Sequence, residues 1–145
     1  MYATAADMIE RFGLPQMIRL SQPENRDAEA VDAARIETAL VDATAVIDSY
    51  IRGRYALPIA QPPKDIVRAT CILARYDLAQ GERMDPSEEM AKARKDIIGW
   101  LESIARELVT IDAPLAQASG ASHVSSGQRV TDRPRDVTYD SLTAY

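Results

Sequence analysis

Hydrophobic side chains recur at alternating steps of three and four residues in two long stretches of the chain, which is the spacing of one face of an α-helix. The first stretch covers residues 28–52 and contains neither glycine nor proline, and the second covers residues 86–108. Both patterns predict long amphipathic helices. Their apolar positions are Ile36, Leu40, Ala43, Ile47 and Tyr50 in the first helix, and Met90, Ala93, Ile97, Trp100 or Leu101, Ile104 and Leu108 in the second.

A third helical stretch, residues 66–78, carries apolar side chains around most of its circumference. A helix that is apolar on most sides is buried, so this stretch predicts a central core helix in which Ile72 and Leu73 are nearly fully buried. It follows residues 52–63, the elbow, where three prolines exclude a continuous helix. Gly53 stands where a left-handed helix cap is common, and Pro63 suits the first position of the next helix.

Capping residues set the expected limits of the remaining elements. Thr4 and Asp7 resemble a capping box that opens a short helix, Gly13 ends it after Phe12, and Pro15 starts a further turn through Leu20. Residues 21–27 form a polar loop with no core residue. In the last helix we expect an acidic N-cap at Asp85, with Pro86 at the first position and Glu88 at the third.

These elements predict an all-α fold, a small helical bundle in which two long amphipathic helices enclose a buried central helix and a short N-terminal helix forms a lid. We assign residues 1–112 to this helical domain. Residues 113–145 are rich in Ser, Thr, Ala and Gly and show no helical period. We interpret them as a flexible C-terminal arm that orders on a partner.

The chain of 145 residues has a formal net charge of −5, and all of the excess acid lies before the arm. This balance disfavours a protein whose main task is to hold DNA, because phosphate neutralisation needs a cationic face. The single cysteine excludes an internal disulfide framework. No run is long enough to span a membrane, and the first residues lack a signal-peptide pattern, so we expect no membrane contact.

Groups that could support catalysis are scarce. His123 has no carboxylate within four residues, and Cys71 lies on the most buried helix, where an inert thiol is the better interpretation. No metal-binding or nucleotide-binding spacing occurs. We therefore expect neither an enzyme nor a cofactor or metal.

Four residues are candidates for an interface with other proteins: Arg52, Arg54, Tyr55 and Arg75. Arg52 and Arg54 flank Gly53 beside Tyr55. Their positive charges either interact with the dipole at the C-terminus of the preceding helix or contact a phosphate or a partner protein. Arg75 shares a helix face with Arg68. That face either pairs with acids of this chain or meets another subunit, and both alternatives stay open.

Several stretches resemble Mu-like phage and prophage head-to-tail connector proteins, over roughly residues 1–112. The matching sequences are MYAT at residues 1–4, DMIERFG at 7–13, IDSYI at 47–51 and RYALP at 54–58, followed by Pro63, Val67, Cys71, Ile72, Ala74, Arg75, Tyr76, Trp100 and Leu101. These residues are typical of helix packing and do not form a catalytic motif.

The resemblance implies a small helical adaptor, or head-completion protein, of the virion neck that assembles in the host cytoplasm. Such a protein forms a homo-oligomeric ring between the portal and the tail-completion proteins and lets DNA pass without reading its sequence. The alternative is a small DNA-binding or DNA-packaging accessory module.

Overall fold

The computed structural model describes residues 1–80 and 84–116. In these two ranges the chain forms five α-helices and no strand longer than an isolated bridge. The helices are α1 (Ala5–Phe12), α2 (Leu14–Ser21), α3 (Ala33–Ile51), α4 (Lys64–Ala79) and α5 (Glu88–Ala105). The predicted all-α class is confirmed.

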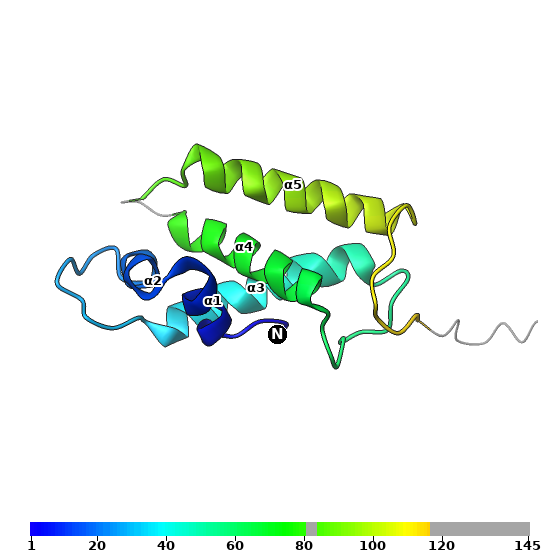
Figure 1. Ribbon diagram of the computed structural model, residues 1–145, viewed down its shortest axis with the longest axis horizontal. Helices are drawn as coiled ribbons and strands as arrows, with labels where there is room; N and C mark the ends of the chain where they lie inside the picture. The colour runs from blue at the N-terminus through cyan, green and yellow to red at the C-terminus, as the bar shows by residue number, and fades with distance from the viewer. Residues whose placement is uncertain (81–83, 117–145) are drawn as a thin grey trace, which may run out of the picture.

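Helices α3 and α4 form the most extensive helix pair, and α5 packs against both (Figure 1). Helices α1 and α2 cover the other side of this pair at the end where α3 begins. The α4 positions that are buried include Ile66, Ala69, Cys71, Leu73, Ala74 and Leu78. Leu73 is 2% exposed, as predicted for the central helix, but Ile72 is only half-buried, so the prediction of nearly full burial is wrong for Ile72.

Capping interactions define both ends of α1. Thr4 accepts from the backbone N–H of Asp7, and the Asp7 carboxylate accepts from the backbone N–H of Thr4, so the predicted capping box is present. Gly13 ends α1 with a φ of 85°, a conformation that an L side chain would strain. These caps define the limits of α1, the short N-terminal helix that the sequence predicts.

Tyr2 ties the start of the chain to α3 and to the elbow. Its hydroxyl donates to the Asp48 carboxylate and accepts from the backbone N–H of Ile59, and its backbone N–H donates to Thr44 Oγ1. Burial, together with the bond donated to Asp48, raises the pKa of Tyr2 to about 12. Three segments distant in sequence are thus joined through one side chain.

Two helices begin later than the sequence predicts, because a residue further along the chain provides the N-cap. Asp32 accepts from the backbone N–H of Arg35 and starts α3 at Ala33, so residues 28–32 are not helical. Ser87 accepts from the backbone N–H of Met90 and starts α5 at Glu88, so the expected cap at Asp85 is wrong. In both cases a side chain with suitable geometry formed the cap nearer to the helix.

The helix limits at the elbow also differ from the prediction. Gly53 does not adopt the left-handed conformation expected of it, because the backbone at Arg52 remains right-handed as α3 ends. Pro63 is the N-cap of α4 rather than its first residue. Ser21, expected in a loop without core residues, is the last residue of α2 and is buried, where its hydroxyl accepts from the backbone N–H of Asp32.

The largest difference between the predicted and the observed helices is at the end of α5. The helix stops at Ala105, and Leu108, expected on its apolar face, is 75% exposed. The sequence pattern left Trp100 and Leu101 as alternatives for one apolar position of this helix. Leu101 is buried and Trp100 is half-buried. None of the helices in the described ranges is long and apolar enough to cross a membrane.

Candidate protein–protein interface

Arg54 holds the last turn of α5 against the elbow. Its Nη1 atom donates to the backbone carbonyl of Val109 at 3.1 Å and lies 3.4 Å from that of Ile104. Its guanidinium also stands 5.5 Å from the centre of the Tyr55 ring. A cation at a helix C-terminus offsets carbonyl groups that lack intrahelical partners, so this half-buried side chain stabilises the fold of its own chain.

Tyr55 lies inside the molecule. It is 2% exposed, and its hydroxyl accepts from the backbone N–H of Ile111 at 3.0 Å. Ile111 belongs to residues 106–116, the strap, which follows α5 and returns along the elbow (Figure 1). The Tyr55 side chain therefore makes its contacts within its own chain. Of the three neighbouring candidates Arg52, Arg54 and Tyr55, Arg52 is the exposed one.

The strap pairs with the elbow through its backbone as well. The N–H of Ala56 donates to the carbonyl of Pro114, and the N–H of Ala116 donates to the carbonyl of Arg54, both at 2.9 Å. Tyr55 and Leu115 form an antiparallel bridge between these two bonds. Residues 113–116 of the predicted arm thus contact the helical domain, while residues 117–145, including His123, lie outside the described part of the chain.

The outer side of the strap presents apolar and acidic side chains to solvent. Leu108 and Leu115 are 75% and 61% exposed, and Glu107 and Asp112 are also exposed. Glu107 has a positive φ of 63°, an uncommon conformation for a residue other than glycine, which turns the chain out of α5. This apolar tip, the exposed face of residues 107–115, is the feature at the elbow best suited to a protein partner.

Arg75 lies away from the elbow, against α1 and α2. Its guanidinium is 4.6 Å from the centre of the Phe12 ring. The orientation of the Gln16 amide that satisfies both of its polar atoms places its oxygen 2.8 Å from Arg75 Nη2 and its nitrogen 3.1 Å from the Phe12 carbonyl. The structure therefore separates Arg75 from the other three candidates and gives it contacts within the chain.

Arg68, its neighbour on the α4 face, is exposed. It lines a groove between α4 and α5 together with Asp65, Asp96, Ile97 and Trp100. The two arginines thus differ, because one is half-buried against a ring and the other extends into solvent.

Cys71 is fully buried, and burial raises the pKa of its thiol, which the nearby Arg11 only partly offsets. A raised pKa keeps the thiolate scarce, as expected for a core cysteine. Among residues 1–80 and 84–116, no three side chains of His, Cys, Asp or Glu converge as metal ligands would.

Comparison with known proteins identifies a family of similar sequences. A family model described as Bacteriophage Mu, Gp36 matches residues 2–129. The chain belongs to this Gp36 family. It is 32% identical over 103 residues to Gene product J of Escherichia phage Mu, with 71% of this chain and 70% of that protein covered. It is 31% identical over 133 residues to the Mu-like prophage FluMu protein gp36 of Haemophilus influenzae, with 88% and 90% covered.

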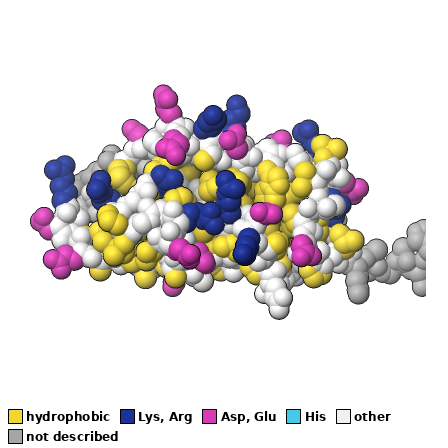
Figure 2. Space-filling model, in the orientation of Figure 1, with side chains coloured by type: hydrophobic (Ala, Val, Ile, Leu, Met, Phe, Trp, Pro, Cys, Tyr) yellow, Lys and Arg dark blue, Asp and Glu magenta, His cyan; other side chains and the backbone are white. Residues whose placement is uncertain are grey.

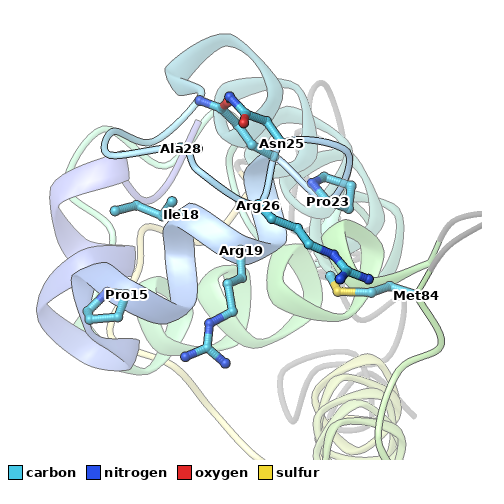
Figure 3. Close-up of a pocket in the computed structure, with 9 residues that line it drawn as sticks. Pro15, Ile18, Arg19, Pro23, Asn25, Arg26, Ala28 and Met84 are labelled. Atoms are coloured by element: carbon cyan, nitrogen blue, oxygen red, sulfur yellow. The ribbon is translucent and has the colours of Figure 1, made fainter.

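The Gp36-family chain has a second surface feature at the end of the bundle opposite the strap (Figure 1). Two adjoining hollows of about 450 and 460 Å³ lie beside α2 and share Pro15, Arg19 and Met84. We refer to them together as the α2 groove, part of which is drawn in Figure 3. Sequence reasoning missed both this groove and the apolar tip, since each is formed by segments far apart in sequence or outside any periodic pattern.

Proposed function

We propose that this Gp36-family protein is a structural head-to-tail connector of a Mu-like phage, which forms a homo-oligomeric ring between the portal and the tail-completion proteins. The observation that carries the proposal is the family match over residues 2–129, which contains almost all of the packing residues that resemble connector proteins. The virion neck is then its place in the particle.

The physical character of the surface supports this role. The apolar tip exposes Leu108 and Leu115 on the strap, which pairs with the elbow, and large exposed aliphatic side chains are typical of surfaces that contact a partner. A net charge of −5 also favours passage of DNA over retention of it, because like charge weakens contact with phosphates. Figure 2 shows acidic, basic and hydrophobic side chains interspersed over one face, without a continuous cationic strip.

The test is the mass of the purified full-length chain, alone and with its portal, measured by light scattering. We expect a ring-sized assembly in the presence of the portal. Arg52→Glu should weaken this assembly while leaving the melting temperature close to the parent value, because Arg52 is exposed and makes no long-range hydrogen bond in the described structure. Lys92→Glu, an equal charge reversal at an exposed position of α5, is the matched control.

A chain that stays monomeric with the portal at high concentration would contradict the connector proposal. A sequence-selective DNA complex that persists at physiological salt would favour the small DNA-binding or packaging module in its place.

A further inference from the structure

The α2 groove has the dimensions and the lining of a site for aliphatic side chains. Its apolar lining includes Phe12, Pro15, Ile18, Leu20, Met84 and Met90. An enclosed apolar cavity of about 150 Å³ already accepts a small aromatic molecule. Either hollow of the groove, at about 450 or 460 Å³, is therefore large enough for an aliphatic side chain and the backbone that carries it.

The rim of the groove is cationic. Arg19 and Arg26 line it and are both exposed, and Figure 3 shows Arg26 extending toward Met84 while Arg19 extends from α2 in another direction. The acids of the same loop, Glu24 and Asp27, do not line either hollow. A segment that combines aliphatic side chains with carboxylates is therefore the complementary occupant.

The apolar tip at the other end of the molecule has this composition. Leu108 and Leu115 are its most exposed apolar side chains, and Glu107 and Asp112 are the acids beside them. The one strap cation next to Glu107, Arg106, is already within 3.8 Å of Glu102. The tip therefore combines exposed leucines with exposed carboxylates, which are opposite in charge to the rim of the groove.

We propose that the apolar tip of one copy of this chain docks into the α2 groove of the next copy. The two surfaces lie at opposite ends of the long axis (Figure 1), so they cannot reach one another within a single chain. A contact between unlike surfaces is heterologous, and repeated copies of it close into a ring if the rotation between copies allows. This inference deepens the proposed ring and rests on it, since it names the surfaces that join neighbouring subunits.

The first experiment uses thiol cross-linking with two full-length single variants, Thr110→Cys in the strap and Asn25→Cys on the groove. Both positions are exposed, and both spare the leucines and arginines of the proposed contact. Cys71 is buried with a raised thiol pKa, so the parent protein should resist a short bismaleimide and serves as the blank. We expect cross-linked dimers from the mixture of the two variants and none from either variant alone. Dimers of Thr110→Cys alone would indicate a symmetric contact and overturn the proposal.

The second experiment measures self-association by sedimentation velocity, with and without the portal. Leu108→Asp should abolish association and Arg19→Glu should weaken it at least tenfold, without a change in melting temperature, since both residues are exposed. Adding Asp112→Lys to Arg19→Glu should restore most of the loss, because the pair of charges is then exchanged. Lys92→Glu lines neither hollow and should have no effect.

The outcomes separate this inference from the connector proposal. Rings that form on the portal with unchanged stability in Leu108→Asp and Arg19→Glu would overturn the tip-and-groove contact and leave the connector intact. If these variants lost portal binding while contacts between copies stayed intact, the groove would be a portal-binding site. That result would also overturn the tip-and-groove contact. Absence of any assembly in the parent protein, with or without the portal, would remove both proposals.

Discussion

The layer of α3 and α4 and the elbow end of the molecule are held together by different forces. In the layer, α3 and α4 bury apolar side chains along their whole length against each other. At the elbow, the strap packs only the partly buried Val109, Ile111 and Ala113 against the core. It is also attached by hydrogen bonds of the backbone, of Arg54 and of Tyr55, while its leucines face solvent. Helix α5 is intermediate, with only Leu101 and Ile104 fully buried among its residues.

This difference separates a region that resists change from a region suited to assembly. Buried aliphatic contacts give the free energy of folding, whereas each neutral hydrogen bond contributes only about 0.5–1.5 kcal/mol in net terms. The strap combines a few such bonds with three partly buried side chains, so we expect it to be ordered in position but to cost less free energy to move than the layer. A subunit contact at the strap can therefore adjust to a partner without loss of the bundle.

The largest effect is expected in the layer. Leu73→Ala should reduce the free energy of unfolding by about 2–5 kcal/mol, because burial is lost and a cavity is left. Ile72→Ala, one position away but half-buried, is the matched control and should cost clearly less. Urea denaturation of both variants measures the difference. Equal midpoints for Leu73→Ala and the parent would contradict the role of α4 as the central helix.

Next in size is the loss of the elbow clamp. Arg54→Glu should destabilise the monomer by about 1–3 kcal/mol, because two carbonyl groups lose a charged donor and face a carboxylate. Arg52→Glu should change stability by less than about 0.5 kcal/mol, as is usual for exposed substitutions. Thermal melting of the two variants compares neighbouring arginines of the same elbow. If Arg54→Glu melted with the parent, the clamp would have no energetic role.

A smaller effect is expected at high pH, through Tyr2. Its folded pKa of about 12 lies above the ordinary value of 10.0, so the fold favours the protonated hydroxyl. This contribution is complete below pH 10 and is lost as the pH rises from 10 to 12, since the unfolded chain ionises first. Urea midpoints between pH 8 and 11.5 should fall more steeply for the parent than for Tyr2→Phe. Parallel curves would show that Tyr2 titrates normally.

The smallest effect is expected where α3, α4 and α5 meet. Burial raises the pKa of Asp77, and the neighbouring Asp42 raises it further, while Arg94 opposes the shift. A folded pKa above the unfolded value means that ionised Asp77 opposes folding at neutral pH. Asp77→Asn should therefore raise the melting temperature slightly at pH 7, and this gain should shrink as the pH falls toward the pKa of the carboxyl. A lower melting temperature at pH 7 would indicate that its attraction to Arg94 dominates.

Elements with local signals could be predicted from the sequence. The capping box at Thr4, the stop at Gly13 and the apolar stripe of α3 depend on residues within one or two turns of each other, so their spacing reveals them. The starts of α3 and α5 lie later than predicted. The absence of glycine and proline from residues 28–52 does not mark where α3 begins, and Asp32 provides its N-cap. In α5, Ser87 provides the N-cap in place of Asp85.

The candidate site could be predicted only in part. Arg54 and Tyr55 were identified as important, but their partners, Val109 and Ile111, lie 55 and 56 residues away along the chain. A hydrogen bond between a side chain and such a distant backbone group leaves no period in the sequence. For the same reason, Leu108 was assigned to the apolar face of a helix that in fact ends at Ala105. The interface roles of Arg52, Arg54, Tyr55 and Arg75 stay predictions.

The chain contains a single tryptophan, Trp100, and it lies half-buried in the groove between α4 and α5. Its fluorescence emission therefore reports on the contact between α5, which has few buried residues, and the α3–α4 layer. A red shift that precedes the loss of helical circular dichroism would report α5 separating before the α3–α4 layer unfolds. The protein thus carries its own optical probe for the order in which its two regions come apart.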